Sequence, residues 1–316
     1  MRMTAIRFSR LVLAALAVMA ASASAQTPAS QAPAAPAPPD FSKVEIKTTK
    51  IATNFYELEG QGGNIGVLVG PDGVFMVDSQ FAPLSEKIAA AIRQISDGRI
   101  RFMVNTHVHG DHTGGDENFA KMGVTIFARD ELRARLAQPP PAANGTPTRP
   151  PAPAALPMVT YRGPVTIHMN GEDVQLIPVP VAHTDGDTLV RFAVADVLMP
   201  GDYFRSLGYP NIDRNNGGSL KGMLEGIDAT IALAGPNTKV VPGHGAVTDR
   251  AGLIAHRDMI IAIRDRASRL VQQGKTQQEV VAAKLTADYD ARVPGGAAAN
   301  PDRFVGQVYA ELKAAR

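Results

Sequence analysis

The chain has 316 residues, 45% hydrophobic and 20% charged, which allows a folded core and excludes a disordered protein. Without the three arginines of its first 25 residues, the remaining 29 Lys and Arg nearly balance the 30 Asp and Glu, so no nucleic-acid partner is indicated. Cysteine is absent, which excludes disulfides, cysteine nucleophiles and thiolate metal sites.

Residues 1–25 have the three parts of a secretory signal peptide. Arg2, Arg7 and Arg10 precede the apolar run 11–21, and Ala23-Ser24-Ala25 fits an A-x-A cleavage site. An uncleaved membrane anchor is the alternative, but the apolar run is shorter than a membrane span requires. We therefore expect a mature chain that begins at Gln26, is periplasmic or secreted, and has no stable membrane insertion after cleavage.

After an Ala/Pro-rich linker (26–40), we expect a single domain over 41–316 that begins with strands and continues with helices, twice. The dipeptide Asn170-Gly171 and the run Pro71-Asp72-Gly73 are typical of hairpins. Strands are predicted at 44–58, 64–69, 74–77, 101–105, 165–168, 174–179, 189–194, 197–199 and 239–241, and helices at 83–95, 220–233 and 249–274. Two such halves predict an α/β (α+β) fold with two sheets face to face and helices outside, an αββα four-layer sandwich.

Two further segments stand apart from this pattern. Residues 139–157 hold eight of the 24 prolines, and we interpret them as a mobile insertion; the alternative is that they border a pocket. Residues 276–316 are predicted to form a helical tail that packs on the outside.

The richest motif lies in Thr106–Gly115, directly after a predicted buried strand. It holds His107, His109, Asp111 and His112 within six residues, and imidazole with carboxylate suits zinc and similar divalent ions. His183 and His244 also follow apolar strands, in polar, Gly-rich surroundings. The last two of the seven histidines, His168 and His256, have no polar, Gly-rich neighbours and are interpreted as hydrogen-bonded bystanders.

The order His107-x-His109-x-Asp111-His112, then His183, Asp202 and His244, resembles the metallo-β-lactamase-fold hydrolase superfamily over roughly 45–250. The resemblance implies the αββα sandwich and two zinc ions per chain. It implies that His107, His109 and His183 hold the first zinc, that Asp111, His112 and His244 hold the second, and that Asp202 bridges both. A bridging Asp is similar to glyoxalase II, lactonases and other ester or thioester hydrolases, whereas β-lactamases usually carry Cys or Ser there.

The resemblance implies an exported bacterial metallo-hydrolase that acts on a small-molecule ester, thioester or lactone. Two zinc ions would share a hydroxide that attacks the substrate carbonyl, and Asp111 would be both ligand and the catalytic group that orients the hydroxide. The alternatives are a β-lactam-hydrolysing enzyme, which export favours and Asp202 opposes, and a non-enzymatic metal-binding module. The sequence carries no signal for the oligomeric state.

Supporting residues are also predicted. Asp78 follows the strand 74–77 and either fixes the tautomer of a histidine or caps a turn. The residues that follow Asp202 either line the substrate pocket or pack the loop: Tyr203, Phe204, Arg205, Tyr209 and Arg214.

Overall fold

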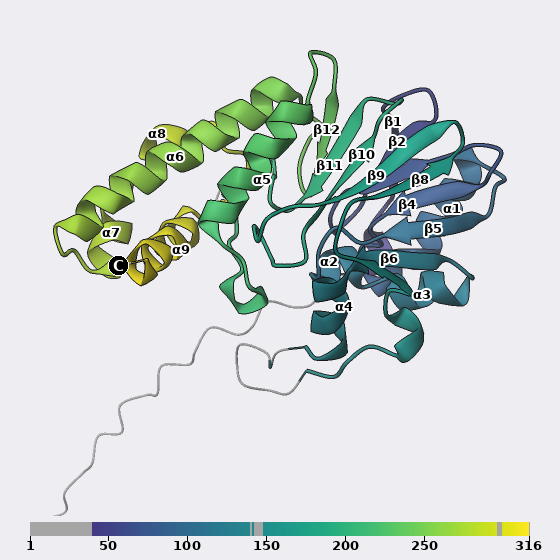
Figure 1. The fold of residues 1–316 in the computed structure, drawn as a ribbon, viewed down its shortest axis with the longest axis horizontal. Coiled ribbons are helices and arrows are strands. Elements are labelled where there is room, and N and C mark those ends of the chain that lie inside the picture. Colours follow the sequence, from purple (N-terminus) through teal and green to yellow (C-terminus); the bar gives the residue numbers. More distant parts are fainter. Residues whose placement is uncertain (1–39, 140, 142–147, 296–298, 316) are drawn as a thin grey trace, which may run out of the picture. The chain divides into compact units, whose positions relative to one another are not determined.

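The computed structural model describes residues 40–139, 141, 148–295 and 299–315 (Figure 1). The predicted signal peptide, its cleavage site and all but the last residue of the linker lie outside the described residues, as do residues 140 and 142–147 of the Pro-rich segment. From Asp40 onwards the chain forms one compact unit. In this described part, no helix is long and apolar enough to cross a membrane.

The first sheet has seven strands in sequence order, β1 to β7. Strands β1 to β4 pair antiparallel, whereas β4 to β7 pair parallel. Because β4 and β5 are parallel neighbours, the loops that follow them begin side by side. The strands are β1 (Lys47–Lys50), β2 (Phe55–Glu59), β3 (Ile65–Leu68), β4 (Val74–Val77), β5 (Ile100–Val104), β6 (Thr125–Arg129) and β7 (Val159–Tyr161).

The second sheet has five strands in the order β12-β11-β10-β9-β8. The predicted hairpin at Asn170-Gly171 is confirmed, because both residues have positive φ, 56° and 72°, as a type I′ turn requires. Strands β11 and β12 pair parallel, so Asp202 and His244 follow neighbouring strand ends. The strands are β8 (Val165–Met169), β9 (Glu172–Pro178), β10 (Thr188–Phe192), β11 (Val197–Gly201) and β12 (Lys239–Pro242).

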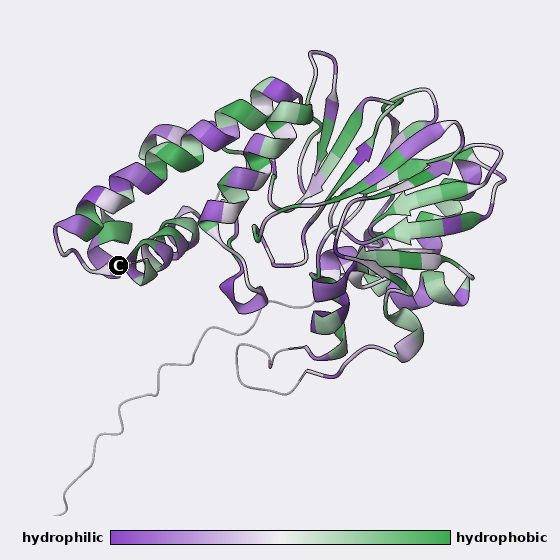
Figure 2. Ribbon diagram, in the orientation of Figure 1, coloured by the Kyte–Doolittle hydropathy of each residue, from purple (hydrophilic) through white to green (hydrophobic). Residues whose placement is uncertain are grey.

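Helices cover the outer faces of both sheets. α1 (Ser85–Ile95) and α3 (Asp116–Lys121) pack on the first sheet, and α5 (Leu220–Leu233) and α6 (Arg250–Gln272) pack on the second. The core between the sheets contains Phe55, Phe75 and Phe192, and the strands are largely hydrophobic (Figure 2). The remaining helices are α2 (Gly110–Thr113), α4 (Asp130–Ala137), α7 (Gln277–Ala282), α8 (Ala287–Asp290) and α9 (Pro301–Ala314), with 3-10 turns at Phe41–Lys43, Ala82–Leu84, Pro153–Ala155 and Arg214–Asn216. The predicted αββα sandwich is confirmed.

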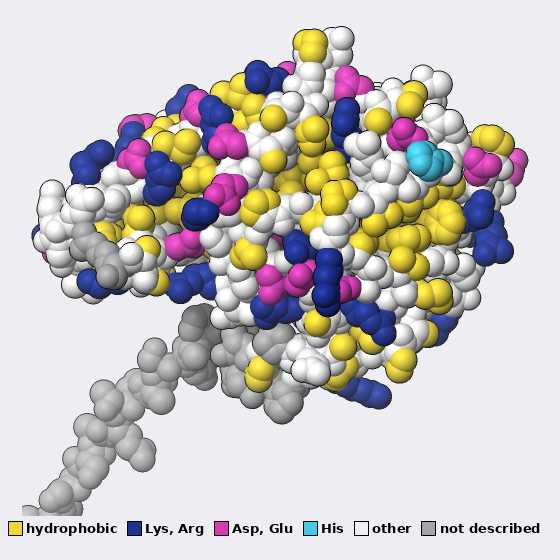
Figure 3. All heavy atoms as spheres, viewed as in Figure 1, with side chains coloured by type: hydrophobic (Ala, Val, Ile, Leu, Met, Phe, Trp, Pro, Cys, Tyr) yellow, Lys and Arg dark blue, Asp and Glu magenta, His cyan; other side chains and the backbone are white. Residues whose placement is uncertain are grey.

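The structure differs from the predicted strands in two places. The strand predicted over 44–58 is a hairpin of β1 and β2, in which the N–H groups of Ile51 and Ala52 both donate to the carbonyl of Phe55. Strands β6 and β7 were not predicted, because they are short and only partly buried and therefore lack a long apolar run. The described face in Figure 3 carries Lys and Arg interspersed with Asp and Glu, in keeping with the balanced charge.

Glu57, on β2, is a buried carboxyl remote in sequence from the predicted ligands. It is 3% exposed, and its Oε1 has no hydrogen-bond partner among the described residues. Burial and, next, the charge of Glu59 raise the pKa of Glu57 to about 7. The folded state therefore holds this proton more tightly than the unfolded state, and the free energy of unfolding falls as pH rises from about 4.5 to about 7.

Replacing Glu57 by Gln is expected to remove this fall in the free energy of unfolding, because an amide does not titrate. Above pH 7 the variant should be more stable than the parent by about 1–2 kcal/mol, a rise in Tm of a few degrees, and the difference should shrink as pH falls towards 5. Thermal unfolding between pH 5 and 8 measures it, with the exposed Glu45→Gln as control. A pH-independent difference would contradict the assigned pKa.

Candidate metal centre

The first four predicted ligands lie on the loop and short helix that follow β5. This strand ends at Val104 in the interior of the first sheet, and α2 begins at Gly110. Asp78, directly after β4, accepts hydrogen bonds from the backbone N–H of Thr106 at 2.7 Å and from its Oγ1 at 2.8 Å. These bonds tie the beginning of the ligand loop to the neighbouring strand end.

The other three predicted ligands come from the second sheet. His183 follows β9, Asp202 follows β11 and His244 follows β12. Close backbone approach makes this assembly possible, because a Cβ on Gly243 would collide with Oδ1 of Asp202 and a Cβ on Gly63 would collide with the ring of His112. Both positions therefore require glycine.

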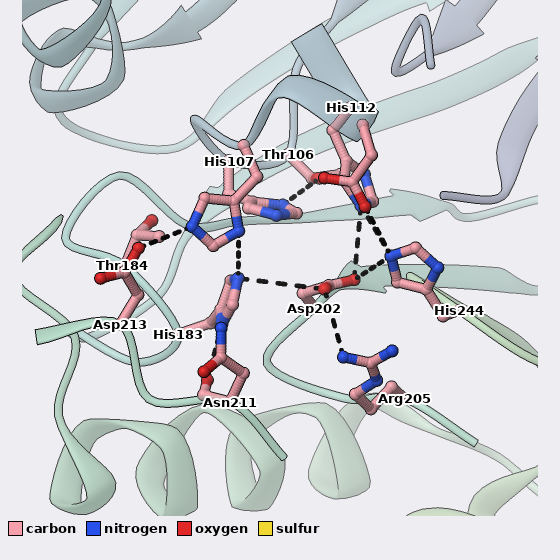
Figure 4. A network of polar contacts seen from close by, with 12 residues as sticks. Thr106, His107, His112, His183, Thr184, Asp202, Arg205, Asn211, Asp213 and His244 are labelled. Carbon is pink, nitrogen blue, oxygen red and sulfur yellow. Dashed lines mark hydrogen bonds and ion pairs between the residues drawn. The ribbon is translucent and has the colours of Figure 1, made fainter. Parts of the chain in front are cut away.

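All seven predicted ligands meet in one cluster, seen in part in Figure 4. Their donor atoms form three groups, each with all atoms within 4.8 Å of one another. One group is His107, His109 and His183; the second is His107, His112 and Asp202; the third is Asp111, His112 and His244. The first and third are the two triplets that the sequence resemblance implies.

The carboxylate of Asp202 lies between these two triplets. Its Oδ2 is 3.9 Å from Nε2 of His183, whereas its Oδ1 is 3.4 Å from Nε2 of both His112 and His244. Each oxygen therefore faces a different triplet. This is the geometry that a bridging carboxylate needs.

Four of the five histidines of the cluster are held by hydrogen bonds at the ring nitrogen that faces away from it. Oδ2 of Asp78 lies 2.7 Å from Nδ1 of His112, so the prediction that Asp78 fixes a histidine tautomer is confirmed. The sequence analysis missed three other partners. They are Asp213 at 2.7 Å from His109 Nε2, the carbonyl of Asn211 at 2.6 Å from His183 Nδ1, and Thr106 Oγ1 at 3.0 Å from His107 Nδ1.

The charges of the cluster fit divalent cations. Burial raises the pKa of Asp202, but the adjacent His244 and His112 outweigh it and hold that pKa well below its usual range. Burial lowers the pKa of His107 far below its usual range and that of His183 to about 4. Burial also lowers the pKa of His112, but Asp78 and Asp202 outweigh it and hold that pKa well above its usual range. At neutral pH the cluster therefore combines ionised carboxylates and the neutral imidazoles of His107 and His183 with a protonated His112, whose proton a bound metal ion would displace.

Two buried atoms in the cluster also lack a partner. Nε2 of His107 and Oδ1 of Asp202 have no hydrogen bond within the described part of the chain, although both are buried. Such groups are costly to leave unsatisfied. A metal ion in the cluster would satisfy both, so the residues present fit the implied zinc ions.

The loop that follows Asp202 mainly packs. Tyr203, Phe204 and Tyr209 are buried in the core between the second sheet and its helices, and the hydroxyl of Tyr203 lies 2.7 Å from Thr230 Oγ1. Arg214 is exposed at a 3-10 turn. Arg205 alone points towards the cluster, with Nη1 3.9 Å from Oδ2 of Asp202 (Figure 4).

The two histidines interpreted as bystanders lie outside the cluster. His168 is exposed on β8 and bonds Asp173 on β9 at 2.6 Å, as a bystander should. His256 is a different case, because it lies on α6 and its buried Nε2 has no hydrogen-bond partner among the described residues. The expectation of a hydrogen-bonded bystander is therefore wrong for His256.

The C-terminal tail is helical as predicted and packs on α6, outside the sheets. It also supports the cluster, which the sequence did not indicate. On α9, Gln307 accepts a hydrogen bond from the N–H of Ile212 at 3.0 Å and donates one to Oδ1 of Asn211 at 2.8 Å. These residues belong to the segment that orients His183 and His109.

Replacing Gln307 by Ala is expected to loosen this segment and weaken zinc binding by His107, His109 and His183 by about tenfold, since lost supporting hydrogen bonds cost about that in metal affinity. Competition with a chelator measures the affinity. Gln272→Ala, at an exposed position of α6, is the matched control. Equal affinities for both variants would contradict the supporting role.

Comparisons with known proteins agree with this geometry. The profile of the metallo-beta-lactamase superfamily matches residues 58–245, more than half of the chain. No curated protein matches in sequence.

Solved structures show the same fold. The sec-alkylsulfatase Pisa1 from Pseudomonas sp. is 18% identical with a TM-score of 0.63, over 84% of this chain and 50% of that one, so this chain spans half its length. The metallo-beta-lactamase from Pontibacter korlensis is 19% identical with a TM-score of 0.57, over 69% of this chain and 99% of that one. DIM-1 metallo-beta-lactamase is 18% identical with a TM-score of 0.56, over the same shares. Together with the His and Asp cluster, the profile match leads to one conclusion: the chain belongs to the metallo-β-lactamase superfamily of metal-dependent hydrolases.

Proposed function

We propose that the chain is an exported hydrolase with two zinc ions that cleaves a small ester, thioester or lactone. The observation that carries the proposal is the position of Asp202, whose two oxygens face different triplets of donor atoms. A carboxylate with this reach supports a two-ion centre, and the resemblance of a bridging Asp to glyoxalase II and lactonases favours carbonyl esters and thioesters over β-lactams.

The predicted ligands would be divided between the two ions as follows. His107, His109 and His183 would hold one ion, and Asp111, His112 and His244 the other, with Asp202 shared. Bound there, two divalent ions would polarise a carbonyl group and lower the pKa of a water molecule to about 7.

Asp111 is the group best placed to orient an attacking water. Its side chain is 30% exposed, against 5% for Asp202, and its Oδ2 is 3.1 Å from Nε2 of His244. Burial raises the pKa of Asp111, but the hydrogen bond from His244 outweighs it and lowers that pKa to about 2. The carboxylate is therefore an ionised acceptor at neutral pH, and its partial exposure leaves it open to a small molecule.

Two other substrate classes have a specific observation in their favour. β-Lactams are favoured by the match to nearly the full length of known metallo-β-lactamases, and sulfate esters by the larger share of this chain that matches the alkylsulfatase. Both likenesses lie below 20% identity and therefore concern the fold.

The test is a substrate panel on zinc-loaded protein. It comprises a thioester, a lactone, a p-nitrophenyl ester, nitrocefin and a secondary alkyl sulfate. We expect chelator-sensitive turnover of a carbonyl ester, thioester or lactone at the highest kcat/KM. Preference for nitrocefin or the sulfate would replace the proposed substrate class, and no turnover of any of them would favour a non-enzymatic metal-binding module.

Export is a second part of the proposal, and it rests on the signal-like residues 1–25. Expression of the full chain in a bacterial host should give periplasmic protein whose N-terminal residue is Gln26. Cytosolic protein that keeps Met1 would refute export without touching the proposed chemistry.

A further inference from the structure

A cavity of about 260 Å³ lies next to the metal centre, on the far side of Arg205. It is formed by the loop after Asp202, by the N-terminal half of α6 and by the segment 289–294. The backbone closes one end, because the N–H of Gly208 donates to the carbonyl of Pro294 at 2.7 Å. The family profile ends at residue 245, so two of the three walls lie beyond it.

The cavity carries positive charge. Its lining includes Arg205 and Arg292 and, among the described residues, no carboxylate. The guanidinium group of Arg292 stacks on the ring of Tyr289 at 5.2 Å and, among the described residues, donates only to the carbonyl of Asp288, at 3.3 Å. Arg266 stacks on the same ring but is paired with the Asp288 carboxylate at 2.6 Å, so Arg292 has no carboxylate partner in the described part of the chain.

Arg205 is also poorly neutralised. Its Nε donates to the carbonyl of Leu207 at 2.7 Å, and its nearest carboxylate oxygen, Oδ2 of Asp202, is 3.9 Å away. That oxygen belongs to the metal cluster and would be engaged by an ion there. The guanidinium group therefore has capacity for an anion on its cavity side.

His256 also lines the cavity. Its ring lies edge-on to Phe204 with centroids 5.0 Å apart. Burial, with a smaller contribution from Arg205, lowers the pKa of His256 to about 4. The ring is therefore neutral at physiological pH and adds no charge to that of the two arginines.

The remaining lining is largely apolar, with Phe204, Met259 and Val293 among its members. An apolar wall facing two cations is complementary to an amphipathic anion. The volume lies just below the roughly 300 Å³ at which pockets for drug-sized ligands begin, which limits the ligand to a small molecule.

We propose that this cavity is a binding site for a small organic carboxylate, whose carboxylate group is held by Arg205 and Arg292 while its apolar body packs on Phe204, Met259 and Val293. The site goes beyond the proposed hydrolysis and does not depend on which ester is cleaved. Since Arg205 also faces Asp202, only the guanidinium group of Arg205 would separate a bound acid from the metal cluster.

Hexanoate is a suitable probe, titrated into the mature, zinc-loaded protein by isothermal calorimetry. We expect saturable binding of one hexanoate per chain and at least tenfold weaker binding of hexanamide, which has the same shape without the charge. Arg292→Gln, at an exposed position, should weaken hexanoate binding at least tenfold, and so should Arg205→Gln, which removes the other cation.

Arg266→Gln is the matched control, because Arg266 stacks on the same tyrosine from outside the cavity. It should leave hexanoate affinity unchanged. Hexanoate bound directly to zinc would be equally tight in all three variants and would overturn the proposal, as would the absence of binding or equal affinity for hexanamide. None of these outcomes depends on the result of the substrate panel. Carboxylate binding in the cavity can therefore be refuted while the proposed hydrolysis holds, and the reverse.

Discussion

Replacing Asp111 by Asn is expected to lower kcat by about 10²-fold or more while the chain stays folded. Asparagine keeps the shape and one coordinating oxygen but loses the charge that pairs with His244 and the second acceptor that orients water. A loss of this size corresponds to roughly 2.7 kcal/mol of transition-state stabilisation. KM should change less, because the ligand triplet His107, His109 and His183 is unchanged. Steady-state kinetics on the best substrate of the panel measure both.

His168→Asn is the control for this experiment, since His168 is an exposed residue on β8 that bonds only Asp173 among the described residues. It should keep the kcat of the parent. If Asp111→Asn, loaded with zinc and folded by circular dichroism, retains more than about a third of the parental kcat, a loss under ~1 kcal/mol, the role assigned to Asp111 is wrong.

Replacing Asp202 by Asn is expected to lower the metal content from about two zinc ions per chain to one or fewer. The seven donors suffice for two four-coordinate ions only if one carboxylate is shared. An amide has a single coordinating oxygen and no charge, so it cannot serve both triplets. Elemental analysis after dialysis against a zinc buffer measures the content, and kcat should fall by at least 10²-fold in parallel.

Asp173→Asn is the matched control, because it removes a carboxylate from an exposed pair with His168. It should retain two equivalents of zinc. A parent protein that binds one equivalent or less while folded would rule out the two-ion centre altogether. If Asp202→Asn still binds two equivalents of zinc, the two-ion centre stands but Asp202 is not needed to bridge the ions.

Much of the architecture follows from local patterns in the sequence. The helix predicted over 220–233 is α5 with the same ends, because Ser219 caps it by accepting a hydrogen bond from Gly222 N and an apolar stripe continues to Leu233. The Asn170-Gly171 hairpin is equally local, since left-handed φ values favour those two residues. The seven predicted donors could be picked out of the sequence, and they lie together in the structure, because each follows a strand that ends at a recognisable polar run.

The supporting groups of the cluster could not be found in the same way. Asp213 reaches His109 across 104 residues of sequence, and Gln307 reaches Asn211 across 96, so nothing near either residue in the sequence marks it. The same holds for the residues after Asp202. Their types suit a pocket, yet Tyr203 and Tyr209 have core contacts on α5 and the tail that bury them.

There is a physical reason why some features follow from the sequence and others only from the tertiary structure. The amino-acid order alone determined where strands, caps and ligand-rich loops begin and end, because these depend on backbone preferences and on neighbours within a few residues. Tertiary packing alone decided which second partner each imidazole has, that Asp202 lies between the two triplets, and that Arg205, Arg292 and His256 share one cavity. Those relations depend on how two sheets and a C-terminal tail lie against one another, and burial then sets the charge of each group that they enclose.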